Sequence, residues 1–199
     1  IGPGVYALTQ QISVAQAITI QGAGEEPTEV IVDGQWLTRC FNLTASATLR
    51  NLTVMRGTNY SSGAGVNMTG GHIINCTFLS NIVYQLGGGV YMTTGQIENS
   101  RFISNQTTHT GGGSQGGAVV MTAGKILNSV FIGNRSAGSA GGGAVLQTGS
   151  VPGLISNCFF FQNGSVGSGG GVQAATITMV DSSLEENGLY NENSGGGLY

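Results

Sequence analysis

The stretch that decides the fold is residues 87–105, GGGVYMTTGQIENSRFISN. It begins with a glycine triplet and a valine, and it closes on Asn99-Ser100, a phenylalanine and a second asparagine. The same order of residue types returns along most of the chain. A period of about 20–50 residues built from short elements is typical of a solenoid.

The repeat is anchored by an asparagine that precedes a serine or cysteine. The anchors are Asn75, Asn99, Asn128 and Asn157, with Asn51 as a weaker first member and Asp181 as a variant. The two steps from Asn99 to Asn157 are longer than the other three, which are equal to one another. Three residues after the four anchors stand Phe78, Phe102, Phe131 and Phe160, and three residues later stand Asn81, Asn105, Asn134 and Asn163. The Val145 coil has three extra residues around Ser150-Val151-Pro152, and the remaining variation lies after the second asparagine. The unequal steps therefore indicate a constant frame with loops of variable length at one or two corners.

Within one repeat the apolar residues follow the strand period of two. Val90 and Met92 flank Tyr91, and Ser100 and Phe102 flank Arg101. No stretch of the sequence shows a sustained helical period. We therefore predict an all-β fold, a right-handed parallel β-helix of about eight coils with roughly 24–29 residues each. Equivalent residues of successive coils then stack at about 4.8 Å.

The predicted β-helix covers residues 1–199 as a single domain. Residues 1–57 are expected to form irregular N-terminal coils, and residues 58–199 the regular repeats. A last glycine triplet at residues 195–197 opens a coil that the sequence does not finish.

Tight corners between the strands bury backbone groups that must be hydrogen bonded. Asparagine tolerates left-handed backbone, and its amide can bond to the equivalent amide of the next coil. We therefore predict a structural ladder of stacked equivalent side chains, formed by Asn75, Asn99, Asn128, Asn157, Phe78, Phe102, Phe131 and Phe160. Glycines supply the positive φ that the other corner needs.

The composition excludes several classes of protein. Hydrophobic residues make up 40% of the chain and the net charge is only −3, which argues against disorder. Six lysines and arginines in 199 residues argue against nucleic acid as a partner. No apolar run approaches the roughly 20 residues of a membrane-spanning helix.

Two motifs resemble a known family. The segment Gly116-Gly117-Ala118-Val119, followed by Phe131-Ile132-Gly133-Asn134, resembles the GG[GA]V and FxxN repeats of the polymorphic outer membrane proteins of chlamydiae. The resemblance covers residues 63–199. It implies a right-handed parallel β-helix at a cell surface, often with a role in adhesion.

Eight asparagines begin an Asn-x-Ser/Thr sequon, the acceptor of N-glycosylation in secreted proteins. Seven are candidates for modification: Asn42, Asn51, Asn59, Asn67, Asn105, Asn134 and Asn163. The last three share one repeat position, which we place at the mouth of the variable loops, whereas the eighth, Asn75, is expected in a buried corner. The alternative is that the sequons are a by-product of a solenoid rich in asparagine, serine and threonine.

The three cysteines are expected to be buried free thiols. Cys76 and Cys158 share one column but lie three coils apart, roughly 14 Å. A disulfide needs Cα atoms within about 7 Å, and Cys40 falls at a different point of its coil, so we predict no disulfide.

The acidic residues are too dispersed for a hydrolase or lyase site, which needs clustered carboxylates. Aspartate occurs only at Asp33 and Asp181, and most glutamates lie in two groups, Glu25, Glu26 and Glu29, and Glu185 and Glu186. His72 and His109 have no evident partner. We therefore predict no catalytic residue, no metal site and no cofactor, and we expect that the protein is not an enzyme.

The expected function is that of an extracellular structural protein at the cell surface, a glycosylated subunit of a filament, fibre or appendage. Its partners are then other copies or other chains of the same assembly. The last coil stops at Leu198-Tyr199, so either the chain is a trimmed piece, or the array continues, or the next molecule completes the coil, and the last two predict fibres. The alternative is an adhesin or glycan-binding module that binds through residues 106–115. A polysaccharide-active enzyme is the least favoured interpretation.

Overall fold

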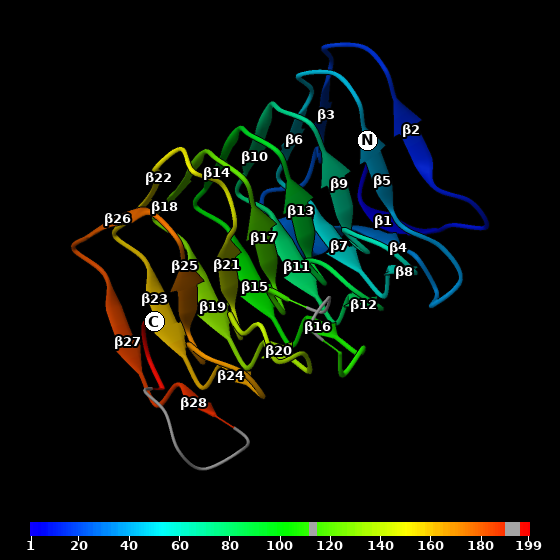
Figure 1. Cartoon of the computed structure of the whole chain (residues 1–199). Helices are drawn as coiled ribbons and strands as arrows, with labels where there is room; N and C mark the ends of the chain where they lie inside the picture. Colours follow the sequence, from blue (N-terminus) through cyan, green and yellow to red (C-terminus); the bar gives the residue numbers. More distant parts are fainter. Residues whose placement is uncertain (112–114, 190–195) are drawn as a thin grey trace.

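The computed structural model describes residues 1–111, 115–189 and 196–199 (Figure 1). The chain forms a parallel β-solenoid of about seven turns, so the predicted all-β fold class is confirmed. Within the described residues, the helical structure is limited to the 3-10 helix η1 (Pro27–Glu29).

Four parallel sheets run along the solenoid, and each coil passes through them in the order A, D, B, C. Sheet A contains β1 (Gly4–Ala7), β4 (Val30–Asp33), β7 (Thr53–Met55), β11 (Thr77–Leu79), β15 (Arg101–Ile103), β19 (Val130–Ile132), β23 (Phe159–Phe161) and β27 (Ser183–Glu185). Sheet D contains β8 (Thr58–Asn59), β12 (Ile82–Val83), β16 (Gln106–Thr107), β20 (Arg135–Ser136), β24 (Gly164–Ser165) and β28 (Gly188–Leu189). Sheet B contains β2 (Ile12–Val14), β5 (Phe41–Leu43), β9 (Val66–Met68), β13 (Val90–Met92), β17 (Val119–Met121), β21 (Val145–Gln147) and β25 (Val172–Ala174). Sheet C contains β3 (Thr19–Gln21), β6 (Thr48–Arg50), β10 (His72–Ile74), β14 (Gln96–Glu98), β18 (Lys125–Leu127), β22 (Gly153–Ser156) and β26 (Ile177–Val180).

The N-terminal coils share the frame of the regular repeats. Sheets A, B and C already begin within residues 1–57, whereas the first strand of sheet D that the structure describes is β8, at Thr58. The less regular pattern of residues 1–57 therefore reflects coils that lack this fourth strand.

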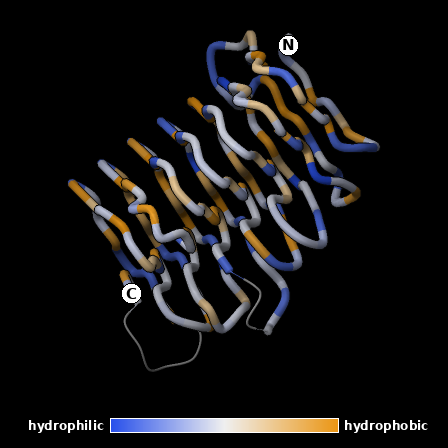
Figure 2. The backbone as a smooth tube through the Cα atoms, turned by 45° about the horizontal axis from the view of Figure 1, so that its top comes forward, coloured by the Kyte–Doolittle hydropathy of each residue, from blue (hydrophilic) through white to orange (hydrophobic). Residues whose placement is uncertain are grey.

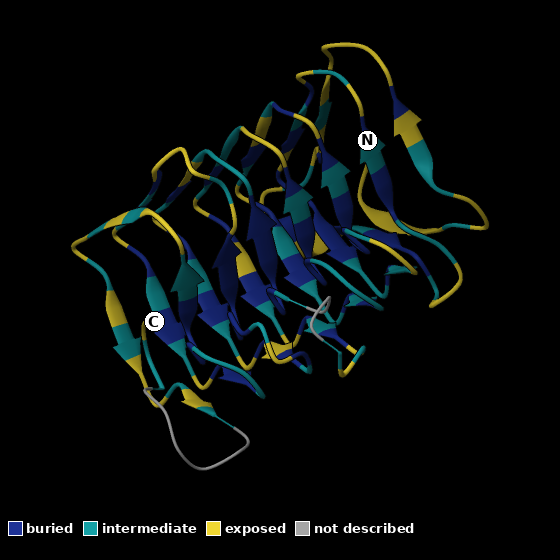
Figure 3. Ribbon diagram, viewed as in Figure 1, coloured by how far each residue is buried: buried dark blue, intermediate teal, exposed yellow. Residues whose placement is uncertain are grey.

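The core consists of columns of equivalent side chains, as the alternation predicts. Val66, Val90, Val119, Val145 and Val172 pair in register through sheet B and are fully buried. The rings of Phe78, Phe102, Phe131 and Phe160 stack with centroids 4.7, 4.8 and 4.7 Å apart, so the phenylalanine part of the predicted ladder is confirmed. Figure 2 shows hydrophobic segments recurring in successive turns, and Figure 3 shows exposed residues gathered at corners and ends.

The anchor asparagines lie at the corner between sheets C and A. Asn75, Asn99, Asn128 and Asn157 have φ angles of 49°, 50°, 48° and 51°, which confirms the predicted left-handed backbone. Their predicted burial is wrong, because all four residues are exposed. Side-chain hydrogen bonds connect only some neighbours of this column among the described residues. Asn75 Nδ2 donates to Asn51 Oδ1 and Asn157 Nδ2 donates to Asn128 Oδ1, both at 2.9 Å.

The continuous ladder is formed by the second asparagine of each repeat, at the corner between sheets A and D. Asn81, Asn105 and Asn134 are fully buried, and Asn163 is 1% exposed. Asn105 illustrates the rung: its Nδ2 donates to Phe78 O of the preceding coil at 3.0 Å and to Asn134 Oδ1 of the next coil at 3.0 Å. The same Oδ1 also accepts the backbone N–H of Asn105 at 2.9 Å. Each rung thus pairs the polar groups that the corner removes from water.

Glycine is required where the chain enters sheet B. Gly87 has a φ of 63°, and a Cβ atom there would lie 2.3 Å from Val90 O. Gly63, Gly116, Gly142 and Gly169 occupy the equivalent position with φ angles between 53° and 68°. The predicted role of the glycine triplets is therefore confirmed for these positions.

The cysteines are free and buried, as predicted. Cys76 and Cys158 share a column with Ser100, Ser129 and Ser182, in which each side chain donates to the carbonyl two residues earlier. Burial raises the pKa of Cys40 and Cys76 to about 12 and that of Cys158 to about 11.

The ladder predicts unequal costs for two asparagines of one coil. Asn134→Ala removes the acceptor of two buried N–H groups of Asn105, and each unpaired group costs about 1–3 kcal/mol. We expect the free energy of unfolding to fall by about 3 kcal/mol or more, measured by urea denaturation with circular dichroism. Asn128→Gly, at an exposed left-handed position, is the control and should cost under about 1 kcal/mol. Equal losses would contradict the assignment of the buried ladder.

The buried thiols predict destabilisation at alkaline pH. In the unfolded chain a thiol ionises near pH 8.5, whereas the folded chain holds its protons to higher pH. Between about pH 8.5 and 11 the unfolded state binds fewer protons, so the free energy of unfolding falls as pH rises. The double variant Cys76→Ser/Cys158→Ser replaces both thiols by serine, the residue that the other coils carry in this column. Its unfolding midpoint should fall less than that of the parent between pH 7 and pH 10, and an identical fall in the two proteins would refute the proposed cause.

Candidate functional site

The sequons at the ladder position are closed to modification in the folded chain. Asn105, Asn134 and Asn163 were predicted at the mouth of the variable loops, but they are at most 1% exposed. Both N–H bonds of each Nδ2 atom are used, by a carbonyl of the preceding coil and by the next asparagine. A glycan on Nδ2 would remove a ladder bond and would have no space, so the prediction for these three residues is corrected.

The other predicted sequons differ in whether the side-chain Nδ2 atom of the asparagine already donates hydrogen bonds. Asn51 is 9% exposed, and its Nδ2 donates to Gly22 O and Gly24 O, so this candidate is corrected too. Asn67 Nδ2 donates to Asn42 Oδ1 at 2.8 Å on the outer face of sheet B. Asn59 Oδ1 accepts from the backbone and the hydroxyl of Ser61, and within the described residues Nδ2 of Asn59 and of Asn42 donates no hydrogen bond. Asn42 and Asn59 are therefore the candidates whose Nδ2 the structure leaves open.

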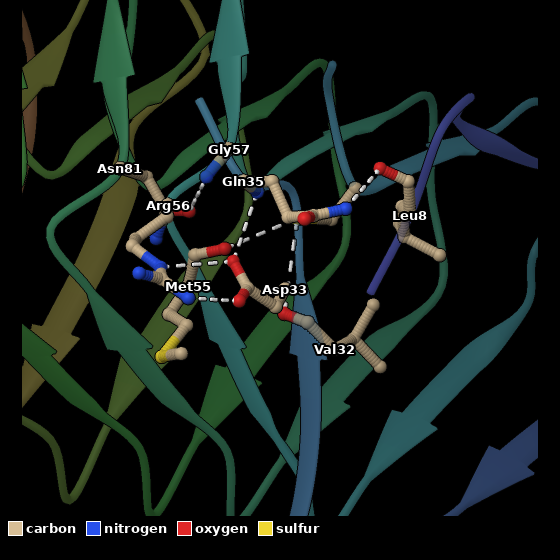
Figure 4. Close-up of polar contacts among 9 residues, drawn as sticks. Leu8, Val32, Asp33, Gln35, Met55, Arg56, Gly57 and Asn81 are labelled. Carbon is tan, nitrogen blue, oxygen red and sulfur yellow. Dashed lines mark hydrogen bonds and ion pairs between the residues drawn. The ribbon is translucent and has the colours of Figure 1, made fainter. Parts of the chain in front are cut away.

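The buried carboxylate of the described residues, that of Asp33, has structural partners. Asp33 is 2% exposed and forms an ion pair with Arg56, whose Nε lies 3.0 Å from Oδ1, while the backbone N–H of Gln35 donates to the same oxygen (Figure 4). Burial alone would raise the pKa of Asp33, but the hydrogen bonds from Arg56 and Gln35 and the charge of Arg56 together lower it. Asp33 therefore stabilises the first coils as an anion.

Three glutamates accept hydrogen bonds from neighbouring groups, and one of them, Glu98, accepts from Gln96. Glu29 accepts the backbone N–H groups of Glu25 and Glu26 at the start of η1, and Glu186 accepts from Gln162. The described residues contain no group of three histidine, cysteine or acidic side chains that could hold a metal ion.

A groove of about 520 Å³ lies outside the N-terminal end of sheet D. One wall is the segment between β4 and β5, with Leu37, Thr38 and Arg39. The other wall consists of β8 and β12 and the residues that follow them, Tyr60 and Tyr84. Figure 1 shows β8, β12 and β16 side by side along this edge of the solenoid.

Three aromatic side chains form a row beside this groove. The rings of Tyr60 and Tyr84 stack at 4.6 Å with an interplanar angle of 13°. His109 packs edge-on against Tyr84 at 4.6 Å, and its Nδ1 accepts the backbone N–H of Gly111. In the neutral ring Nε2 then carries the proton and is a donor. Tyr60 is 71% exposed, so the row presents an aromatic face to solvent.

The groove also offers polar groups. Thr38, Thr58, Thr108 and Asn59 contribute hydroxyls and an amide, and none of the ten lining residues is acidic. Volumes of about 300–1,000 Å³ with few convergent polar groups are usual for sites that bind small molecules. The groove and the aromatic row can therefore hold a ligand that combines flat apolar faces with hydroxyl groups.

A second unusual surface is the outer face of sheet A. Leu79, Ile103, Ile132 and Phe161 lie in one outward column, each partly buried, and the ring of Phe159 lies 5.9 Å from that of Phe161. Toward the N-terminus this face is covered by η1, where Thr53 donates to Pro27 O. The column from Leu79 to Phe161 is an apolar array that repeats at the spacing of the strands, and the exposed Arg101 lies in the column beside it.

Sequence reasoning missed both surfaces, although each leaves a signal. Tyr60 and Tyr84 are separated by one short step of the repeat, so they had to stack. An apolar residue follows each buried phenylalanine, and alternation places it outside. Of the predicted binding loop at residues 106–115, Thr108 lines the groove and His109 extends the row, while residues 112–114 lie outside the described part of the chain.

In the described part of the chain, no helix has the length and apolarity to cross a membrane. Comparison of the chain with models of known protein families gives no match, and neither does comparison with curated proteins. The similarity to the chlamydial repeats therefore rests on the two short motifs, and the fold itself is that of a β-helix repeat protein.

Proposed function

We propose that this protein is an extracellular glycan-binding β-helix that binds saccharides in the groove beside Tyr60 and Tyr84. The observation that carries the proposal is the stacked pair of tyrosines, one of them 71% exposed, on the wall of a groove of about 520 Å³. Sugar rings have an apolar C–H face that packs on aromatic rings, and tyrosine adds a polar tip at low entropic cost. The threonines and Asn59 then supply partners for the sugar hydroxyls.

The proposal reverses the order expected from the sequence, in which a structural filament came first. Part of that expectation rested on glycans at Asn105, Asn134 and Asn163, whose Nδ2 atoms are buried in the ladder. A location at the cell surface remains part of the proposal, supported by the open sequon at Asn42, which does not line the groove. A binding role rather than catalysis is supported by the absence of acidic side chains among the ten residues that line the groove.

Removing one ring of the row should weaken glycan binding. Tyr60→Ala deletes an exposed stacking face, and we expect binding to the best oligosaccharide of a neutral and acidic glycan array to weaken about tenfold, or about 1.4 kcal/mol. The protein is produced in bacteria so that Asn59 carries no glycan, and affinities are measured by calorimetry.

Tyr199→Ala is the matched control, because Tyr199 is 67% exposed and lies at the opposite end of the solenoid. It should bind within twofold of the parent. Absence of any glycan binding by the parent, or an equal loss in both variants, would rule out the groove as a glycan site.

A structural role by self-association is the second candidate, and the apolar outer face of sheet A favours it. A second copy carries the same columns at the same strand spacing of about 4.8 Å, so the two faces can interdigitate along several coils. The partners are then copies of this chain packed side by side. The low net charge of −3 opposes such packing only weakly.

Ile132→Lys tests this second candidate. A lysine in the centre of the outward column would place charges in the contact, so a sedimentation-velocity experiment should show a shift from associated species to monomer. Val180→Lys, on the outer face of sheet C and 42% exposed, should leave the distribution unchanged. A parent protein that is monomeric at all accessible concentrations would exclude lateral self-association.

A further inference from the structure

We infer that the groove selects anionic saccharides and that Arg39 is the residue that selects them. This inference rests on the proposed function of the groove and adds the chemical class of its ligand. It follows from the position of Arg39 in the wall, from its unused donors and from the absence of a compensating acid among the groove residues.

Arg39 is held firmly in the wall of the groove. Its Nε donates to Gly63 O at 2.9 Å, Nη2 to Ser62 O at 2.7 Å and Nη1 to Gln11 Oε1 at 3.2 Å. A guanidinium has five N–H donors, so these three bonds leave two donors, one on each Nη atom. All three acceptors are neutral. The side chain is thus fixed in one orientation, and two of its N–H donors have no hydrogen-bond acceptor among the described residues.

No charge in the groove neutralises this guanidinium. Arg39 is partly buried and forms no ion pair among the described residues, and the ten residues that line the groove include no aspartate or glutamate. The buried carboxylate of Asp33 is engaged by Arg56. A partly desolvated cation without a counter-ion favours an anionic ligand, because each Coulomb interaction is stronger there than in bulk water.

The remaining groups of the groove are compatible with an anion. Nε2 of the neutral His109 ring is a donor, and the hydroxyls of Tyr60, Thr38 and Thr58 can donate as well. A sugar ring on the tyrosines would therefore share the groove with hydroxyl donors and with the cationic side chain of Arg39. Carboxylate and sulfate share the chemistry that this arrangement recognises.

The test compares ligands that differ in charge alone. The probes are a tetrasaccharide of galacturonic acid, its full methyl ester, and a sulfated tetrasaccharide of galactose, measured by calorimetry on the full chain. We expect the acid to bind about tenfold more tightly than the ester in 50 mM salt, with the ratio falling toward one in 0.5 M salt. Binding of the sulfated probe would extend the class from carboxylates to anions in general, and its failure to bind would restrict it to carboxylates.

Three variants test whether Arg39 causes the preference for the acid over the ester. Arg39→Gln should abolish the difference between acid and ester while the ester still binds, and Arg39→Lys should retain most of it. Arg101→Gln removes the same charge from the exposed outer face of sheet A and should change nothing. Should Arg39→Gln fail to fold, Leu37→Glu brings a carboxylate into the groove at a position that is 69% exposed, and it should cancel the preference.

The outcomes separate the two proposals. Equal binding of acid and ester overturns the selection by charge and leaves the groove as a glycan site. A preference that survives both Arg39→Gln and Leu37→Glu overturns the assignment to Arg39. Absence of binding by all three probes and by the glycan array overturns the proposed function itself.

Discussion

The chain of buried amides at the corner between sheets A and D is the interaction on which the solenoid depends. Each rung bonds the carbonyl of the coil before it and the asparagine of the coil after it, so three successive coils are connected through one side chain. Beside this ladder the phenylalanine rings stack at almost the same spacing. The polar and the apolar columns therefore impose the same rise per coil. A larger spacing between coils would break the amide hydrogen bonds and separate the stacked rings at the same time.

Because the contacts that hold the coils together lie inside the solenoid, the residues of the outer surface can vary. The rungs and the stacked rings lie inside, and the glycine turns lie where the chain enters sheet B. Between the second asparagine and those glycines, and again around residues 150–152, the repeat lengthens without any change of register inside. The groove and the aromatic row lie against the first of these variable segments. A surface built there can acquire recognition residues such as Tyr60 and Tyr84 at little cost to the frame.

Much of the frame was predictable because alternation and repeat spacing fix which residues coincide. The valine, isoleucine and phenylalanine columns, the left-handed anchors and the distant cysteines all follow from counting. Which asparagine column is buried did not follow, because both columns have the same spacing and the same tolerance for tight turns. The difference arises from the direction in which each corner turns its side chain, which depends on backbone geometry at Ser104 and Asn99 and not on residue type. The groove escaped prediction for another reason: its lining residues occupy the outer side of successive coils between sheets A and B, and repeat spacing shows that they are neighbours but not that they leave a hollow.

The register of the sheets also determines how such a chain can reach its folded state. Residues that pair between strands are close along the sequence, from the short separation of Ile31 and Thr53 to the longest, such as that of Val90 and Val119. A coil therefore finds all its partners in its immediate neighbours, and loop closure costs nearly the same for each added coil. Folding can proceed from one end while the rest of the chain is still being made or passed through a pore, since each emerging coil adds to a finished template. The first pair of coils must form without such a template, whereas every later coil adds to one that already exists.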